Sequence, residues 1–185
     1  LNGINIEDIS LEYLRNSINL VDQDLFLFSD TFRENVRFGK PTADQKEIKS
    51  STLKAHIYNH IDQLPERFET MIGERGVQLS GGQRQRLSVS RTFLYHSKVV
   101  IFDDSTSAID TQTEKEIRDE MNELGENISL IVIAHRISSV MNLDEILYLD
   151  KGTILERGNH KELIKLNGKY ANLYKMQINP ELRVK

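Results

Sequence analysis

The residues best suited to chemistry are a serine and two glycines at the start of a helix-forming run, Leu79–Arg86 (LSGGQRQR). Ser80 has the type and place of a helix N-cap, and Gln83 stands at the second position of a capping box. Gly81 and Gly82 leave the first-turn amides without side chains beside them. A helix N-terminus with bare amides and a hydroxyl suits an anion such as a phosphate group. Ser-Gly-Gly alone, however, is more simply an ordinary glycine-containing cap.

Two acidic residues follow the next apolar run. Val99–Phe102 is uninterrupted and is followed by Asp103 and Asp104. A buried strand that ends in carboxylates delivers them to the carboxyl edge of an α/β sheet, where ligands bind. Such a run has many purely structural explanations when it stands alone. A functional interpretation depends on its position shortly after the Ser80 motif.

These groups need strands and a helix to hold them. Three continuous apolar runs predict strands buried on both faces, as in a parallel sheet. They are Val99–Phe102, Ile128–Ala134 and Ile146–Leu149. Between the first two we expect a helix capped at Thr111, with Glu114 three residues on, which makes a βαβ unit. A turn and a further strand at 153–156 follow the third.

The first half predicts a mostly helical segment at about 25–95. Before it come a short helix at Ser10–Leu14 and a short strand at Ile18–Val21. Capping-box spacing at Thr31 and at Thr42 predicts two helices, the second extending toward His60.

The tail at 159–177 predicts two amphipathic helices divided by Gly168. Four histidines match no motif and are expected at the surface. They are His56, His60, His96 and His160.

The composition is that of an ordinary globular chain, with 38% hydrophobic and 28% charged residues and a net charge of −4. No basic block is present, so no nucleic-acid partner is expected. The lack of cysteine excludes disulfides and thiolate metal sites and fits a cytosolic location. The longest apolar run, Leu130–Ala134, is far shorter than the roughly 18 residues of a membrane span. Leu1 is not a start methionine, so we expect the chain to begin inside a longer protein.

Taken whole, Leu79–Arg86 resembles the signature motif of ABC ATPases, and Lys98–Asp104 resembles their Walker B strand. By this resemblance, the Ser80 loop binds the γ-phosphate of ATP held by the opposite domain of a dimer, and Asp103 holds the Mg²⁺ shell. Asp104 takes the place of the catalytic base, where the family usually has Glu.

Four weaker matches stand in the order that the family shows. Gln23 resembles the Q-loop glutamine, which touches Mg²⁺ or the attacking water, and residues 73–76 resemble the exporter loop that meets the coupling helices. Ser107–Asp110 resembles the D-loop along the dimer partner, and His135 resembles the catalytic switch histidine that reaches the γ-phosphate. The nucleotide-binding set that the resemblance implies is Gln23, Leu79, Ser80, Gly81, Gly82, Gln83 and Asp110.

The resemblance implies an α/β fold, a P-loop NTPase of the ABC type with a mainly parallel sheet and a helical subdomain. It implies one partial domain over 1–185. Its parts are an α/β core at 1–24 and 96–160, a helical subdomain with the signature helix at about 25–95, and C-terminal helices at 161–185.

The sequence has no G-x-x-x-x-G-K-[ST] loop. We therefore expect that loop and the N-terminal strands to lie upstream of Leu1. On this basis the chain alone is not expected to hydrolyse ATP. In this fold we also expect the missing strand to lie beside Val99–Phe102 and to leave an unpaired edge there.

The tail at 160–174 resembles exporter-type domains fused to a membrane half. The first hypothesis is therefore the ATP-binding and ATP-hydrolysing domain of an ABC exporter, which powers transport through ATP-driven dimerisation at the cytoplasmic face of the cell membrane. The implied cofactors are ATP and Mg²⁺. The implied partners are a transmembrane domain in the same full-length chain and a second ABC ATP-binding domain, with a heterodimer favoured.

Asp104 supports an alternative, in which the chain is the poorly hydrolysing half of a heterodimeric exporter and mainly completes the ATP site of its partner. A third hypothesis is a chromosome-maintenance or DNA-repair ATPase of the same superfamily. It is set aside because those proteins carry long coiled coils between the Q-loop and the signature, and the interval from Gln23 to Ser80 has no heptad run.

Overall fold

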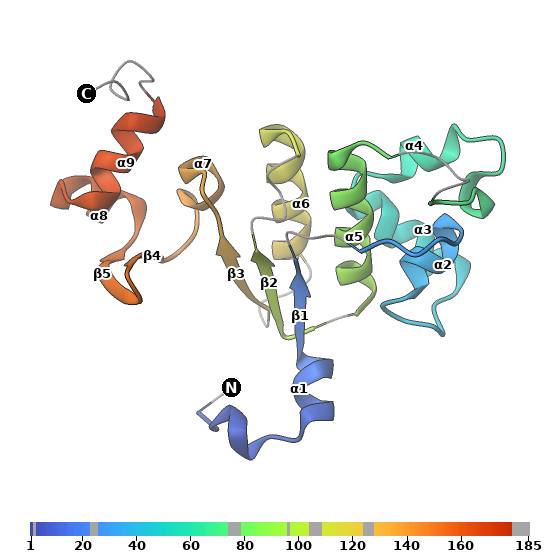
Figure 1. The fold of residues 1–185 in the computed structure, drawn as a ribbon, viewed down its shortest axis with the longest axis horizontal. Helices are drawn as coiled ribbons and strands as arrows, with labels where there is room; N and C mark the ends of the chain where they lie inside the picture. Colours follow the sequence, from blue (N-terminus) through green and yellow to red (C-terminus); the bar gives the residue numbers. More distant parts are fainter. Residues whose placement is uncertain are drawn as a thin grey trace. The chain divides into compact units, whose positions relative to one another are not determined.

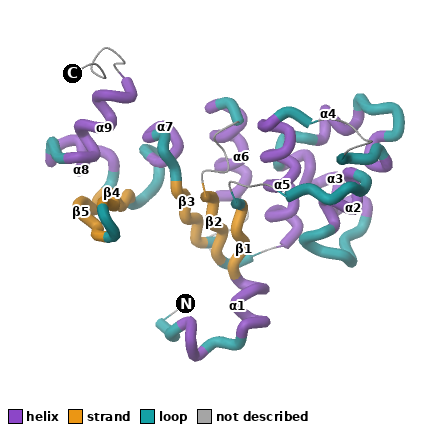
Figure 2. Tube along the Cα trace, in the orientation of Figure 1, coloured by secondary structure: helices purple, strands orange, loops and turns teal. Residues whose placement is uncertain are grey.

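A computed structural model describes residues 1, 3–22, 26–73, 79–95, 97–103, 109–123 and 128–178 of the chain. It contains two compact units, Leu1–Ile133 and Ala134–Lys185. Figure 1 shows the elements of each unit, and Figure 2 shows how helices and strands divide between them.

The first unit is organised around a parallel sheet of three strands. They are β1 (Ile18–Val21), β2 (Val99–Asp103) and β3 (Ser129–Ile133), in the order β1-β2-β3. β2 and β3 were predicted from their apolar runs, and β1 was predicted as a short strand. The third run expected in the parallel sheet, Ile146–Leu149, is outside it: its strand pairs antiparallel with 153–158, because a two-residue turn folds the chain directly back. β2 is paired on both sides, with Val99 opposite Ile18 and also opposite Ser129. The expected free edge at Val99–Phe102 is therefore wrong. β3 instead has a single strand neighbour among the described residues.

Among the described residues of the first unit, one face of this sheet is covered and the other is largely open. Val21, Val100 and Phe102 are buried, in one core with side chains of the helices α5 and α6. Leu20, Ile131 and Ile133 point to the other face and are 55%, 48% and 52% exposed. Because successive side chains of a strand alternate between faces, burial on one side leaves these apolar groups open. The expected burial on both faces is not met.

Six helices of the first unit are described, besides short 3-10 turns at Ile6–Asp8 and Arg67–Glu69. They are α1 (Leu11–Ser17), α2 (Phe32–Arg37), α3 (Gln45–Lys54), α4 (Tyr58–Asp62), α5 (Gly81–Tyr95) and α6 (Thr111–Glu123). In Figure 1, α5 and α6 lie beside the sheet, and α2 to α4 lie beyond α5.

Two predicted helix caps differ from the observed ones. The predicted caps at Ser10 and Thr31 are confirmed. The cap of α3 is Asp44 and not Thr42, because Asp44 and Glu47 exchange both hydrogen bonds of a capping box. The cap of α6 is Asp110, whose carboxylate accepts the Thr113 N–H at 2.9 Å, rather than Thr111.

The helix predicted to run toward His60 is two helices. α3 ends at Lys54, and α4, which contains His60, begins at Tyr58. His56 between them has a φ of 55°, a left-handed conformation that ends a right-handed helix. Because of this break, α4 is a separate helix. Its position relative to α5 determines which residues His60 contacts.

The second unit joins a hairpin to three helices. β4 (Ile146–Asp150) and β5 (Thr153–Gly158) pair antiparallel. Lys151 and Gly152 both have positive φ, as a tight two-residue hairpin turn requires. The helices are α7 (Ile137–Val140), α8 (His160–Leu166) and α9 (Lys169–Ile178), so the predicted pair of tail helices is confirmed.

The core of the second unit is small and separate. It contains Ile137, Ile146, Leu163 and Tyr170. Within the described parts of both units, no helix combines the length and the apolar character that crossing a bilayer demands.

The open sheet face yields a first prediction about Ile131 and Ile133. Replacing both by Thr is expected to reduce self-association of the chain, because an exposed apolar surface promotes contacts between copies. The melting temperature should stay within about 2 °C, since these side chains are largely outside the core. Sedimentation velocity and thermal unfolding measure the two effects.

Val132→Thr is the matched control, because Val132 lies between the two isoleucines and packs against the core. A hydroxyl there costs about 1 kcal/mol or more, which corresponds to roughly 2–4 °C for a chain of this size. Equal melting temperatures for the control and the double variant would contradict the assignment of faces.

Candidate functional site

A reciprocal pair of hydrogen bonds holds the N-terminal end of α5. Ser80 Oγ accepts the Gln83 N–H at 3.2 Å, and Gln83 Oε1 accepts the Ser80 N–H at 2.8 Å. The Ser80 carbonyl accepts the Arg84 N–H at 3.0 Å. The predicted capping box is thus confirmed. Gly81 and Gly82 form the first turn, where no earlier helix carbonyl is available to their amides, and this end suits an anion.

Asp103 is the last residue of β2 and lies opposite Ile133, the last residue of β3. Its side chain is half-buried, at the carboxyl edge of the sheet as predicted. α5 runs in the opposite direction to β2 (Figure 1), so its Ser80 end and Asp103 both lie toward that edge. Leu79, directly before Ser80, is buried in the core.

Several predicted site residues lie outside the described residues, namely Gln23, Asp104, Ser107 and residues 74–76. Of the predicted D-loop, Ile109 is buried and Asp110 is exposed. Hydrogen bonds from Thr113 lower the pKa of Asp110, and the positive charge of Arg86 contributes in the same direction. A carboxylate at Asp110 is thereby favoured beside the first turn of α6.

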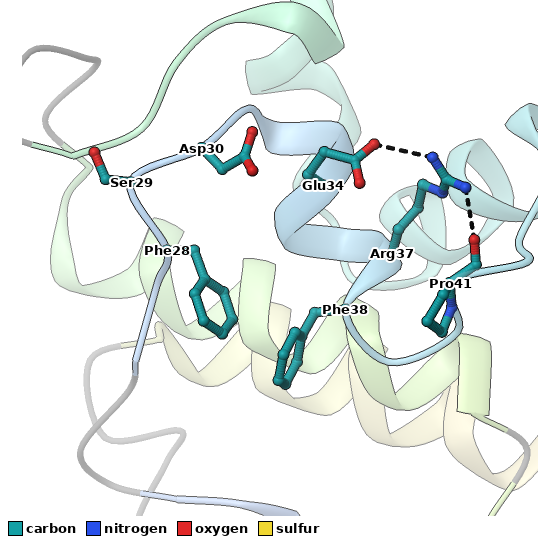
Figure 3. A pocket seen from close by; sticks show the side chains of 7 residues that line it. All are labelled: Phe28, Ser29, Asp30, Glu34, Arg37, Phe38 and Pro41. Atoms are coloured by element: carbon teal, nitrogen blue, oxygen red, sulfur yellow. Dashed lines mark hydrogen bonds and ion pairs between the residues drawn. The ribbon is translucent and has the colours of Figure 1, made fainter.

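A solvent-open pocket of about 540 Å³ lies around the start of α2 and the turn after it. Figure 3 shows the phenyl rings of Phe28 and Phe38 side by side along it, with centroids 4.5 Å apart. Arg37 lies at one end and donates to Glu34 at 3.0 Å and to the Pro41 carbonyl at 2.6 Å. The pocket therefore combines an aromatic floor with a charged rim.

Two segments that are far apart in the sequence meet at this pocket. The Ile72 N–H donates to the Asp30 carbonyl at 2.8 Å, and Thr31 forms a β-bridge with Met71. Gly73 has a φ of 119°, and a Cβ there would lie 2.8 Å from Ser29 Oγ. The first residue of the predicted exporter loop is therefore pressed against the rim of the pocket. Only a glycine meets both conditions without strain.

Asn35 and Arg91 tie this region to α5, and sequence reasoning missed both. Asn35 is fully buried, accepts the Phe28 N–H at 2.9 Å and donates to the Phe28 carbonyl at 3.0 Å. The Arg91 guanidinium donates to the Asn35 carbonyl at 2.8 Å and to the Phe26 carbonyl at 3.0 Å. It also lies over the Phe28 and Phe38 rings, at 5.8 and 5.5 Å. No local sequence pattern marks these two residues.

His135 belongs to the second unit, where its side chain is exposed. Its carbonyl accepts Gln177 Nε2 at 2.7 Å, and the Ile137 N–H donates to Gln177 Oε1 at 2.8 Å. One amide of α9 therefore clamps the backbone on both sides of Arg136. Gln177 is a second residue that the sequence did not single out.

The four histidines outside the motifs do not share one environment. His56 is exposed, 3.3 Å from a Glu116 carboxylate oxygen, as expected for the surface. His60 is half-buried and bonds Gln83, and His160 Nδ1 lies 2.7 Å from the Tyr170 hydroxyl. For these two the surface prediction is wrong. The packing of α4 places His60 against Gln83, which is distant in sequence, and α9, the helix after His160, supplies Tyr170. His96 lies outside the described residues.

The metal-binding capacity of the described residues is modest. No group of three His, Cys, Asp or Glu side chains that could enclose a metal occurs in the described part of the chain. A single half-buried carboxylate such as Asp103 nevertheless suits Mg²⁺, which takes one or two protein carboxylates and keeps several waters.

Similarity to known proteins is extensive. The family described as ABC transporter matches residues 1–107. The chain is 45% identical over 176 residues to Heavy metal tolerance factor 1 of Caenorhabditis elegans, covering 95% of this chain and 22% of that protein. It is 42% identical over 177 residues to an ATP-dependent lipid A-core flippase of Desulfotalea psychrophila, covering 96% of this chain and 31% of that protein.

The fold is similar to that of a solved structure described as a bacterial Atm1-family ABC exporter with ATP bound. The TM-score is 0.91 at 35% identity, covering 96% of this chain and 31% of the other. The chain thus spans about a third or less of the length of these relatives.

The clamp around His135 yields a prediction about Gln177. Gln177→Ala removes an acceptor for the Ile137 N–H and a donor for the His135 carbonyl, at about 1 kcal/mol each. The Ile137 amide should exchange its hydrogen faster, by on the order of tenfold, in a hydrogen-exchange measurement.

Asn172→Ala is the matched control, because Asn172 is an exposed amide on the same helix. It should leave the exchange of Ile137 unchanged. Equal exchange rates of Ile137 in the wild type and in Gln177→Ala would show that the clamp does not hold this loop.

Proposed function

Because the chain belongs to the ABC transporter family, we propose that it is the ATP-binding part of an exporter and that it binds and hydrolyses ATP to power transport. The family and the ABC-type α/β fold predicted from the sequence are both confirmed. The observation that carries the proposal is the capped, glycine-opened end of α5, which lies toward the same sheet edge as Asp103.

The Ser80 end of α5 is proposed to bind the γ-phosphate of ATP held by a second domain of this type. Its hydroxyl and first-turn amides are donors, and the helix dipole favours negative charge there. The capping box supports this role because its two hydrogen bonds hold Ser80 and the first turn of α5 in place in the absence of a ligand. Binding of ATP between two such ends would draw the two domains together.

Asp103 and Gln23 are proposed to hold Mg²⁺, which when bound neutralises charge on the phosphates. Asp104 is proposed to accept a proton from the attacking water and His135 to reach the γ-phosphate, as the family resemblance implies. The exposed side chain of His135, on a backbone clamped by Gln177, suits a residue that must contact a ligand.

The pocket around Phe28 and Phe38 is proposed to receive the transmembrane part of the exporter at the cytoplasmic face of the membrane. Phe38 lines the pocket and is 61% exposed, which suits an apolar partner; Phe26, whose ring packs against Phe28 beside the pocket, is 68% exposed. The rim of the pocket is formed by the segment that follows Gln23 and the segment that precedes residue 74. A partner bound in the pocket would therefore act on chain segments next to both the predicted Q-loop and the predicted exporter loop. The ion pair between Glu34 and Arg37 adds charged groups to the rim, with which a partner could form hydrogen bonds.

The alternative proposal is that the chain is the slower half of an unequal pair. The observation that favours it is Asp104, one methylene shorter than the usual Glu. In that arrangement the intact Ser80 loop serves the ATP site of the partner, while the site of Asp104 binds ATP and turns it over slowly. A heterodimer is the form of assembly that this alternative requires.

The proposed phosphate role of Ser80 is tested by Ser80→Arg in the complete transporter. The added bulk fills the phosphate-binding end of α5, so ATP hydrolysis at the site it completes should fall to background in a phosphate-release assay. Ser50→Arg, at an exposed position of α3, is the matched control and should keep wild-type activity. Wild-type hydrolysis with Ser80→Arg would disprove the proposed role.

Asp104→Glu separates the two proposals. A base must come within roughly 2.6–3.2 Å of the attacking water, and a misplacement near 1 Å costs on the order of 10²-fold in rate. With the partner's own base removed, Asp104→Glu should raise hydrolysis at least about tenfold, or 1.4 kcal/mol of barrier. An unchanged or lower rate would mean that Asp104 does not limit this site and would remove the support for the slower half.

A further inference from the structure

A hydrogen bond joins His60 of α4 to the capping box of α5. The Gln83 side-chain nitrogen Nε2 lies 3.2 Å from His60 Nδ1, across 23 positions of sequence. The other end of the same amide, Oε1, accepts the Ser80 N–H at 2.8 Å. One amide therefore joins the histidine to the backbone of Ser80.

The chemistry of these atoms fixes the protonation state of His60. A backbone N–H can only donate, so the amide oxygen of Gln83 faces Ser80 and its NH₂ group faces the imidazole. Because that NH₂ is also a donor, Nδ1 must present a lone pair, and the ring proton sits on Nε2. His60 Nε2 is buried and has no hydrogen-bond partner among the described residues.

The surroundings of His60 oppose a second proton. Burial lowers its pKa below the usual 6.5, and the positive charge of Arg86 on α5 lowers it further. From α2 the neighbouring group is the uncharged ring of Phe32, at a centroid distance of 6.2 Å. Arg86 is the charged side chain that acts on His60 within the described residues.

We infer that His60 is a positioning residue for the Ser80 loop, and that it acts through Gln83 only as the neutral Nε2–H tautomer. The inference rests on the proposed phosphate role of this loop. Imidazolium carries a proton on both nitrogens and cannot accept from Gln83. Acid therefore removes the link, frees the Gln83 amide and loosens the backbone of Ser80.

The sign of the pH dependence follows from the lowered pKa. In the unfolded chain His60 titrates near 6.5, whereas in the fold it titrates lower. Between these values the unfolded state binds more protons, so folding stability falls as pH drops below 6.5 and levels off below the folded pKa. At pH 7 and above the link is intact.

The hydrogen bond itself is tested in the 185-residue chain by NMR of ¹⁵N-labelled histidine, with His60→Asn to assign the signals. His60 should be the neutral Nε2–H tautomer at pH 7. Gln83→Glu replaces the donor by a carboxylate, so it should shift the proton to Nδ1 and raise the pKa of His60 above that of the wild type. An Nδ1–H tautomer in the wild type, or no response to Gln83→Glu, would overturn the inference.

The positioning role is tested by the pH profile of ATP hydrolysis in the complete transporter. His60→Phe keeps a ring but loses the acceptor, and should lower kcat about three- to tenfold at pH 7.5, the value of one hydrogen bond. His60→Asn places a non-titrating acceptor near Nδ1, and should restore activity and abolish the loss of rate that we expect in the wild type as pH falls through the lowered pKa of His60. His56→Asn, at an exposed position, should leave the wild-type profile unchanged.

The two arms separate this inference from the proposed function. If Ser80→Arg leaves hydrolysis intact while the tautomer is as expected, the proposed function fails and the hydrogen bond stands. If Ser80→Arg abolishes hydrolysis but His60→Phe has the wild-type kcat and pH profile, the loop binds phosphate and the positioning role of His60 is refuted.

Discussion

The parallel pairing of β1 with β2 is the constraint on which the first unit depends. Parallel neighbours cannot be joined by a tight turn, so the chain must cross back over the sheet before the second strand begins. Here the crossing segment holds α2 to α5, and α5 is its last helix. A helix that returns to the start of β2 must begin near the carboxyl edge of the sheet. The Ser80 end of α5 and Asp103 therefore reach one side of the unit for a topological reason.

Buried hydrogen bonds of Asn35 and Arg91 hold the described start of the crossing segment against α5. Asn35 is fully buried, and its side chain bonds the backbone at Phe28, Asp30 and Thr31. Arg91 of α5 bonds the same asparagine. A buried amide or guanidinium without partners would cost several kcal/mol, so these bonds favour the observed arrangement of residues 26–38 against α5. That arrangement carries the aromatic pocket on the outside and the Ser80 loop at its end.

The proposed phosphate-binding end of α5 and the proposed partner pocket are thus two parts of one packed unit. Gly73 presses on Ser29 at the pocket, and Gln83 reaches His60 near the Ser80 loop. A force at the pocket has a continuous path of contacts to α5 through Asn35 and Arg91. This is a physical basis on which a membrane partner and a nucleotide could influence one another, in keeping with the exporter function proposed above.

The sequence alone determined the family, the positions of the strands, the tail helices and the capping box at Ser80, because each depends on residues within a few positions of one another. It did not determine that the strand at Ile146 pairs antiparallel outside the parallel sheet. Periodicity, caps and the motif LSGGQRQR are local signals. Cap positions at Asp44 and Asp110 were missed by one or two residues, since several nearby side chains could accept the same amides.

Tertiary structure decided what no local pattern encodes. The placement of β2 between two strands, the open face at Ile131 and Ile133, and the pairing of residues 30–32 with 70–72 depend on which distant segments meet. His60 shows the reason most clearly. As a lone histidine it reads as a surface residue, and only the break at His56 and the packing of α4 on α5 place its Nδ1 against Gln83. Such contacts depend on how the whole unit packs. The spacing of residues along the chain carries no information about that packing.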